Sequence, residues 1–316
     1  MQDKDEGYLI GVDLGGTKLA AGRIVEERVV DEFLKVRTQG EAGPVGVARQ
    51  IIQLIERLVH PGQVKLKGIG VGVPGSVVWK TGVIKRLTNL PGWDNYPLKS
   101  VLQDYFQVPV VVENDANAAA WAEFKYGAGE GSIDMVYLTV STGIGGGIVI
   151  NGQLLRGTTG TAGEIGHMIL NPQGERCNCG NLGCWETLSS GTAIAKKAQK
   201  CISQGSKSLI SSIAEEEIKA EHVFEAYQRG DEVARLVVDE ALDYLGIGVA
   251  NLVNIINPQK VIIGGGVTKA GPIIFSAVRS KVQTLGYAQA ALTQILPAKL
   301  QDYGGVIGAA ALVMEH

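Results

Sequence analysis

The sequence predicts an α/β protein with two domains. The chain has 316 residues, of which 45% are apolar and 19% are charged. A chain of this length buries a large core and usually divides into more than one domain. A strand, a glycine-rich loop and a returning strand occur twice, at 9–24 and at 136–150. We therefore expect one such unit in each domain, and two unrelated glycine-rich hairpins are the alternative explanation.

Apolar patterns predict the individual elements in order. In the first half they predict strands at 8–14, 19–25, 67–73 and 109–113, and helices at 45–59 and 114–126. In the second half they predict strands at 135–140, 148–150 and 260–263, a long helix at 231–256 and a final helix at 304–314. Pro258 is expected to end the long helix.

The predicted domains follow from this order. Residues 1–117 form an N-terminal α/β domain, and 303–316 are a candidate to return to it. Residues 118–302 form a larger C-terminal α/β domain that carries a cysteine-rich segment.

The overall charge and the N-terminus exclude several classes of protein. The net charge of −3 and the pI of about 5.9 indicate no nucleic-acid or membrane surface. Residues 1–7 contain no apolar run that could act as a signal peptide. No apolar stretch reaches the roughly 18 residues of a membrane span. We expect a soluble, cytoplasmic protein.

Two glycine-rich loops are candidates for phosphate binding. One is Gly15-Gly16-Thr17-Lys18, and the other is Ser141-Thr142-Gly143. Their backbone N–H groups, hydroxyls and ammonium group are donors that suit phosphate oxygens. Asp13, at the end of the first strand, could hold Mg²⁺ or its waters. The alternative for each loop is an ordinary hairpin turn.

Other glycine motifs in the chain do not predict a nucleotide site. The G-x-x-x-x-G-K-[ST] pattern of a P-loop is absent. Gly70, Gly72 and Gly75 match G-x-G-x-x-G, but Pro74 interrupts the motif and strand-like residues follow it. We expect these glycines to permit close packing.

Asp115 is the candidate general base. The sequence Glu113-Asn114-Asp115 lies where a strand meets a helix. A carboxylate there could accept a proton from a sugar hydroxyl during phosphoryl transfer, and Asn114 could hydrogen-bond another hydroxyl. The alternative is that Asp115 only caps the helix.

A structural zinc site is the strongest local signal. His167, Cys177, Cys179 and Cys184 supply one imidazole and three thiolates, which form a closed tetrahedral set. Glu164 and Glu186 flank this segment, and their carboxylates suit vicinal sugar hydroxyls. His167 could bind zinc through one ring nitrogen and a sugar hydroxyl through the other. The alternatives are free thiols and glutamates that are solvated surface charges.

Several of these stretches together resemble the ROK sugar kinases, most closely their bacterial glucokinases. The matching stretches extend from Leu9 to Val313: GVDLGGTK, VENDANAAA, LTVSTGIGGGIV, GTTGTAGEIGH, CNCGNLGCWE and VIIGGGV. The glutamate, histidine and cysteine residues in this order make the resemblance specific. The resemblance implies an actin-like fold of two α/β domains.

The resemblance also implies roles for individual residues. Asp115 would be the catalytic base, and the sugar hydroxyls would be held by Gly75, Asn89, Asn114, Glu164, His167 and Glu186. Phosphates would be bound by Asp13 to Lys18 and by Thr142-Gly143, and adenosine would lie against Gly265-Gly266. The family also contains repressors with an N-terminal helix-turn-helix, for which the eight residues before the first strand leave no room.

These inferences predict an enzyme that transfers phosphate from ATP to the 6-hydroxyl of glucose, with catalytic Mg²⁺ and structural Zn²⁺. One alternative is a kinase for another hexose, such as mannose, fructose or N-acetylmannosamine. The other is a non-enzymatic sugar sensor, which would not need Asp115 or the phosphate loops. The expected partners are a hexose and ATP, and the family resemblance suggests a homodimer.

Overall fold

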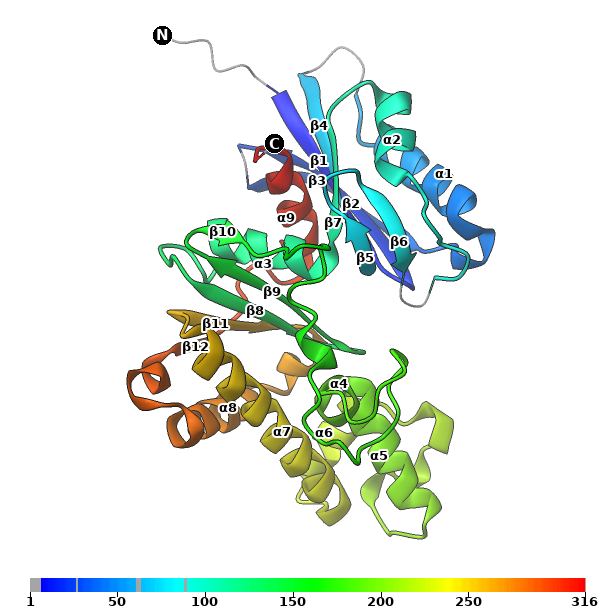
Figure 1. Ribbon diagram of the computed structural model, residues 1–316. Helices are drawn as coiled ribbons and strands as arrows, with labels where there is room; N and C mark the ends of the chain where they lie inside the picture. Colours follow the sequence, from blue (N-terminus) through cyan, green and yellow to red (C-terminus); the bar gives the residue numbers. More distant parts are fainter. Residues whose placement is uncertain (1–6, 27, 61–63, 88–89, 316) are drawn as a thin grey trace. The chain divides into compact units, whose positions relative to one another are not determined.

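The computed structural model describes residues 7–26, 28–60, 64–87 and 90–315 (Figure 1). The chain divides into two compact units. Unit 1 comprises Met1–Gly131, Gly147–Gly163 and Lys299–His316, and unit 2 comprises Ser132–Gly146 and Glu164–Ala298.

Two five-stranded sheets share one strand order. The first, β3-β2-β1-β4-β7, contains β1 (Gly7–Leu14), β2 (Lys18–Val25), β3 (Val29–Arg37), β4 (Lys65–Val73) and β7 (Val110–Asn114). The second, β10-β9-β8-β11-β12, contains β8 (Met135–Val140), β9 (Ile144–Ile150), β10 (Gln153–Leu154), β11 (Lys260–Gly264) and β12 (Gln294–Pro297). In each, three consecutive strands are extended by two later, parallel ones. This repeated order supports one structural unit used twice.

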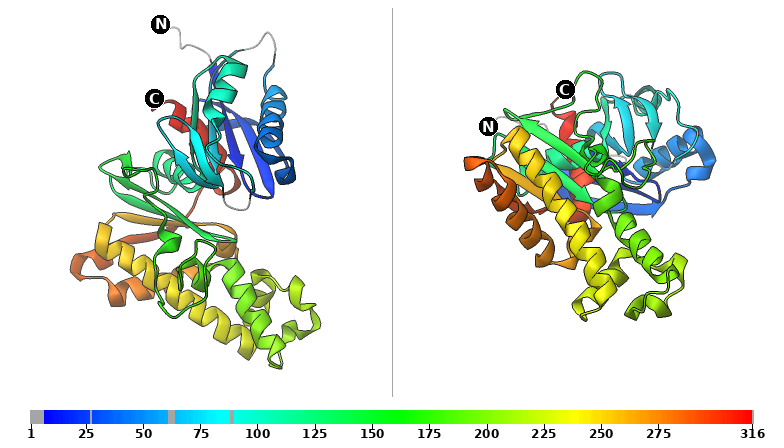
Figure 2. Two further views of the ribbon diagram at one scale, coloured as in Figure 1. Left: turned by 45° about the vertical axis from the view of Figure 1, so that its right-hand side comes forward. Right: turned by 60° about the horizontal axis from the view of Figure 1, so that its bottom comes forward.

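The helices and a small hairpin complete the two units, as further views show (Figure 2). Unit 1 contains α1 (Gly43–Glu56), α2 (Leu98–Phe106), α3 (Asp115–Tyr126), α9 (Gly304–Val313) and the hairpin of β5 (Gly75–Val78) and β6 (Val83–Leu87). Unit 2 contains α4 (Glu186–Ser189), α5 (Gly191–Ser203), α6 (Ala220–Gln228), α7 (Glu232–Ile256) and α8 (Pro272–Leu285). None of the helices in the described chain is long and apolar enough to cross a membrane.

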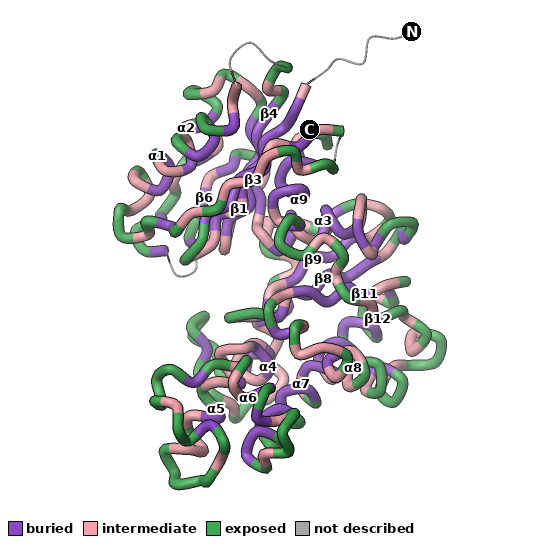
Figure 3. Tube along the Cα trace, turned by 180° about the vertical axis from the view of Figure 1, so that it is seen from behind, coloured by how far each residue is buried: buried purple, intermediate pink, exposed green. Residues whose placement is uncertain are grey.

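The first sheet has a core on each face, and most residues of β1, β2, β4 and β7 are buried (Figure 3). No residue of the edge strand β3 is buried. Alternate side chains of a strand point to opposite faces. Ile10 and Val12 therefore join the core beneath α1 and α2. Leu9 joins the core formed with α3 and α9.

The final helix, α9, packs closely on the first sheet because glycines remove the side chains between them. A Cβ on Gly70 would lie 1.7 Å from the carbonyl oxygen of Ala309. A Cβ on Gly308 would lie 1.8 Å from the carbonyl oxygen of Ala118 on α3. The packing role predicted for Gly70 is thus confirmed.

The units divide the chain differently from the predicted domains. The predicted boundary at residue 117 falls inside α3, which lies entirely in unit 1, as does the segment Gly147–Gly163. The close contact between α3 and α9 gives a physical reason for keeping both helices in one unit.

Candidate active site and metal centre

The carboxyl ends of three parallel strands of unit 1 bring candidate residues into one row. Asp13 of β1 pairs in register with Gly72 of β4, and Gly72 pairs with Glu113 of β7. Asn114 and Asp115 follow directly. This edge of an α/β sheet is where ligands usually bind.

Asn114 and Asp115 have different roles at the start of α3. Asn114 is the N-cap, and its Oδ1 accepts a hydrogen bond from the backbone N–H of Asn117 at 3.1 Å. Its Nδ2 donates to the carbonyl oxygen of Gly75 at 3.3 Å. Asp115 is the first helical residue and accepts from the backbone N–H of Ala116 at 2.8 Å. Asn114 therefore caps the helix, and the positive end of the helix dipole lies beside the Asp115 carboxylate.

A buried ion pair that the sequence did not reveal lies behind these residues. Glu113 is only 3% exposed, and its Oε2 accepts from Arg156 Nε at 2.6 Å. Its Oε1 accepts from the backbone N–H of Asn114 and from Asn117 Nδ2, at 3.0 and 3.1 Å. A charged residue at the end of an apolar strand signals a buried partner, but the sequence does not identify that partner.

The first phosphate-loop candidate is a tight turn between β1 and β2. The backbone N–H of Gly15 donates to the carbonyl oxygen of Lys18 at 2.8 Å. Thr38 fixes the turn from outside, since its hydroxyl donates to the carbonyl oxygen of Gly15 at 2.8 Å. Gly16 is half-buried, whereas Thr17 and Lys18 are exposed at the tip.

Asp13 fits a cation site at the end of β1. Burial raises the pKa of its carboxyl to about 6, and the positive charge of Lys35 lowers it. Gly305 of α9 lies so near that an added Cβ would be 2.8 Å from the carboxylate. A hard cation such as Mg²⁺ takes oxygen ligands and would offset the cost of burying this charge.

In unit 2, the loops that follow β8 and β11 lie at the carboxyl ends of these two parallel strands. Gly264 of β11 pairs in register with Thr139 of β8. Gly265 then turns the chain with a φ of 91°, and a Cβ there would lie 2.3 Å from the carbonyl oxygen of Val140. A Cβ on Gly266 would lie 3.6 Å from Ser141 Oγ. The structure thus brings Gly265 and Gly266 beside the loop that contains Thr142 and Gly143.

Glu186 connects that loop to the cysteine cluster. Its Oε2 accepts from the backbone N–H of Ile144 at 3.2 Å, and its Oε1 lies 3.5 Å from Cys177 Sγ. A Cβ on Gly143 would lie 2.3 Å from Oε2. Glu186 is therefore held in a fixed position and is not a solvated surface charge.

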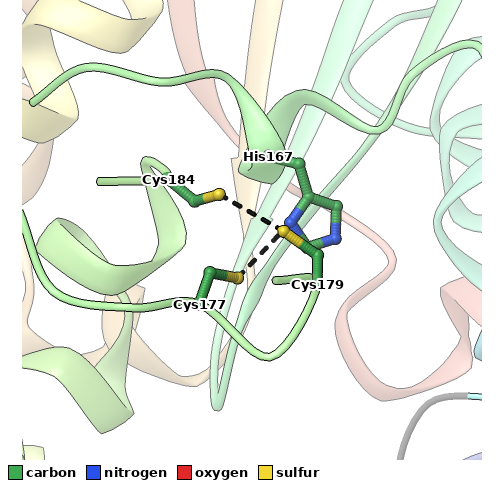
Figure 4. A group of neighbouring side chains, drawn as sticks. All are labelled: His167, Cys177, Cys179 and Cys184. Atoms are coloured by element: carbon green, nitrogen blue, oxygen red, sulfur yellow. Dashed lines mark hydrogen bonds between the residues drawn. The ribbon is translucent and has the colours of Figure 1, made fainter. Parts of the chain in front are cut away.

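The predicted metal ligands form a compact group (Figure 4). The ligand atoms of His167, Cys177, Cys179 and Cys184 all lie within 4.8 Å of one another. His167 Nδ1 is 3.7 Å from Cys177 Sγ, and the sulfurs of Cys179 and Cys184 are 3.5 Å apart. With zinc–sulfur bonds of about 2.3 Å, the sulfurs of a tetrahedral site lie about 3.8 Å apart. The group fits zinc and leaves no position for substrate on the metal.

The surroundings of the three thiols change their acidity in different directions. Burial raises the pKa of Cys184 to about 12, and burial raises the pKa of Cys177 as well. A hydrogen bond from the backbone of Asn181 lowers the pKa of Cys179. Cys177 and Cys184 would therefore keep their protons at neutral pH without a metal. A bound divalent cation reverses this preference and favours the thiolates.

His167 offers its two ring nitrogens to different groups. Nδ1 faces Cys177, while Nε2 lies 3.9 Å from Glu164 Oε2. Gly166 holds this turn against β9, because a Cβ there would lie 2.0 Å from the carbonyl oxygen of Ile144. This geometry is compatible with the predicted double role of His167.

The candidate residues fall into two groups. Unit 1 contains Asp13, Gly15, Gly16, Thr17, Lys18, Gly75, Asn114 and Asp115, and unit 2 contains Thr142, Gly143, Glu164, His167, Cys177, Cys179, Cys184, Glu186, Gly265 and Gly266. Asn89 lies outside the described residues.

The repeated sheets define a two-unit α/β protein, and one unit carries a histidine–cysteine group that fits zinc. The chain belongs to the ROK family, whose family model matches residues 9–316. A glucokinase of Halalkalibacterium halodurans is 36% identical, over 98% of this chain and 96% of its own. A xylose repressor of Caldicellulosiruptor bescii is 35% identical, over 99% of this chain and 79% of its own.

A solved structure confirms the fold. The ROK family glucokinase of Streptomyces griseus, in complex with glucose and AMPPNP, matches with a TM-score of 0.85 and 34% identity. The match covers 98% of this chain and 100% of that one. The predicted actin-like α/β fold of the ROK sugar kinases is therefore correct.

Proposed function

We propose that this chain is an ATP-dependent kinase that phosphorylates glucose at its 6-hydroxyl, with Asp115 as the general base. The glucokinase relative and the glucokinase structure with glucose and AMPPNP support this activity. The observation that carries the proposal is the position of Asp115, at the first turn of α3 and in the row of strand ends that contains Asp13.

The proposed reaction uses the residues as follows. Asp115 accepts the proton of the 6-hydroxyl as that oxygen attacks the γ-phosphorus of ATP, and ADP leaves. Sugar hydroxyls are assigned to Gly75, Asn89, Asn114, Glu164, His167 and Glu186. Asp13 to Lys18 and Thr142-Gly143 are assigned to the phosphates, and Gly265-Gly266 to adenosine.

Two metals belong to the proposal. Mg²⁺, when bound, neutralises charge on the transferred phosphoryl group, and Asp13 is the residue that would hold it. His167, Cys177, Cys179 and Cys184 would hold a structural zinc that orients His167.

A coupled assay of ADP release tests the proposal with ATP and a panel of glucose, mannose, fructose and N-acetylmannosamine. Asp115→Asn should lower turnover at least about a hundredfold with a modest change in sugar affinity. Asp104→Asn, an exposed aspartate on α2, is the matched control and should behave as wild type. Near-normal turnover in Asp115→Asn would rule out the base assignment.

A non-enzymatic sugar sensor is the competing function, because the xylose repressor is similar to 99% of this chain. A sensor would bind a sugar and release no ADP with any of the hexoses. Preferred turnover of another hexose would instead keep the kinase and change its substrate.

A further inference from the structure

We propose that Arg156 and Glu113 form a positioning pair that orients Asn114 and Asp115 for phosphoryl transfer. This inference rests on the proposed function, and it assigns a role to two residues that contact neither substrate in that proposal. The pair joins residues 43 positions apart in the chain, within unit 1.

Glu113 is the centre of the network. Both of its carboxylate oxygens have partners, and the side chain is 3% exposed. Its bond to the backbone N–H of Asn114 fixes the peptide that joins Glu113 to Asn114, one residue before the candidate base. Its bond to Asn117 Nδ2 holds the first turn of α3, which Asn114 caps through Asn117 N. Asp115 lies between these fixed points, so its carboxylate moves little unless the network breaks.

Arg156 fixes the orientation of Glu113 from a separate segment. Its guanidinium lies over the ring of Trp79, with the central carbon 4.8 Å from the centroid. Its backbone carbonyl accepts from the N–H of Ala162 at 3.1 Å, which folds the segment around it. A Cβ on Gly160, in the same segment, would lie 2.6 Å from the carbonyl oxygen of Val77 on β5. The arginine is therefore anchored independently of Glu113.

Stability alone is a weak reason for this arrangement. The desolvation cost of a buried ion pair often cancels the attraction between its charges, so apolar replacements of similar volume are frequently tolerated. The pair does restrict the orientation of both side chains, however, because both Glu113 oxygens accept hydrogen bonds and Arg156 is held by Glu113 and by the ring of Trp79. A displacement of about 1 Å at a reacting group can lower a rate about a hundredfold.

The experiment compares three variants with wild type: Arg156→Met, Glu113→Gln and the double variant. Arg156→Met leaves a buried carboxylate without its cation, whereas the double variant replaces the pair with neutral groups and is expected to fold. Both substrates are varied in the coupled assay, and glucose affinity is measured directly by calorimetry.

If the pair positions Asn114 and Asp115, kcat/KM for glucose falls between about tenfold and about a hundredfold in Arg156→Met, with KM for ATP within about twofold of wild type. Glucose affinity falls as well, since Asn114 is misplaced. The double variant loses about as much activity as Arg156→Met, although it is more stable to heat. This combination separates positioning from simple destabilisation.

Arg279→Met is the matched control. Arg279 also lies over an aromatic ring, 5.9 Å from the Phe275 centroid, and donates to the carbonyl oxygen of Ile295 at 2.7 Å. Neither of these two interactions involves a candidate site residue. Its loss should lower thermal stability while leaving KM for glucose unchanged.

A folded double variant with glucose kinetics within about twofold of wild type would overturn the inference. So would a fall in kcat that matches the loss of folded protein and leaves both KM values unchanged. Wild-type protein that phosphorylates no hexose would instead overturn the proposed function, so the two failures are distinguishable.

Discussion

The carboxyl of Asp13 makes the stability of the protein depend on pH. Burial raises its folded-state pKa to about 6 from an ordinary value of 3.8, so folding favours the protonated form. Below about pH 4 the folded protein has the full stabilisation from this group. As the pH rises from about 4 to about 6, the free energy of unfolding falls by up to about 3 kcal/mol. Asp13 is thus costly at neutral pH unless a cation or its waters bind it.

Asp13→Asn should therefore be more stable than wild type at pH 7 in the absence of nucleotide and Mg²⁺. The advantage should grow between about pH 4 and pH 6 and then level off. Urea denaturation of both proteins across this pH range measures the difference between their free energies of unfolding. Contributions from titrating groups that the two proteins share cancel in this difference. A constant difference at all pH values would contradict the raised pKa of Asp13.

The four candidate metal ligands predict one zinc ion per chain. Removing one thiolate should weaken retention of the metal, because a zinc–sulfur bond is lost and only water can take the fourth position. Cys184→Ser should retain much less zinc than wild type after dialysis against a chelator and should melt at a lower temperature. Cys201→Ser changes a half-buried cysteine outside the cluster and is the control. Elemental analysis with thermal melting checks both, and a fully stable, metal-free wild type would contradict the structural role.

At the scale of elements, one buried carboxylate fastens α3 to two other segments. Glu123 is 2% exposed, and its Oε1 accepts from the backbone N–H groups of Lys299 and Leu300, both at 2.8 Å. Its Oε2 accepts from the N–H of Ala128 at 2.8 Å. Lys299 begins the stretch of chain that returns to unit 1, so Glu123 fixes that return to the helix that begins with Asp115.

Glu123→Ala should lower the free energy of unfolding by about 2–4 kcal/mol, because three backbone N–H groups lose their hydrogen bonds to this buried carboxylate. Glu123→Gln keeps the shape and one acceptor oxygen, but its amide NH₂ group faces the N–H of Ala128. This variant should lower the free energy of unfolding by about 1–3 kcal/mol. Denaturant titration gives both values, and a loss below about 1 kcal/mol for Glu123→Ala would show that water replaces the carboxylate.

The sequence predicts elements and local motifs better than long-range contacts. Apolar periodicity located β1, β8 and α7 within about two residues, because it reports burial of nearby side chains. The four candidate zinc ligands could also be recognised from the sequence, because they lie within one short segment. The partners of Glu113 and Glu123 were not readable. Those hydrogen bonds join residues 43 and 176 positions apart, and a folded backbone is needed to bring them together.

At the scale of the whole molecule, neither unit is one continuous piece of chain. Unit 1 is built from three stretches and unit 2 from two, so the chain passes between them after Gly131, Gly146, Gly163 and Ala298. The predicted boundary at residue 117 leaves out the return of Gly147–Gly163 to unit 1, whereas the candidate return of 303–316 lies within the stretch Lys299–His316 of that unit. Periodicity marks where elements begin and end, but it carries no information on which elements pack together.

This interleaving predicts that the protein unfolds in one cooperative transition, although many two-domain proteins do not. Gly70→Ala perturbs unit 1, because its Cβ would lie 1.7 Å from the carbonyl oxygen of Ala309. Overpacking of this kind costs about 1–3 kcal/mol, or several degrees of Tm. Cys184→Ser perturbs unit 2. In scanning calorimetry each variant should shift one common peak, because unfolding either unit releases segments that the other needs. Two peaks, each moved by only one of the variants, would show that the units unfold independently.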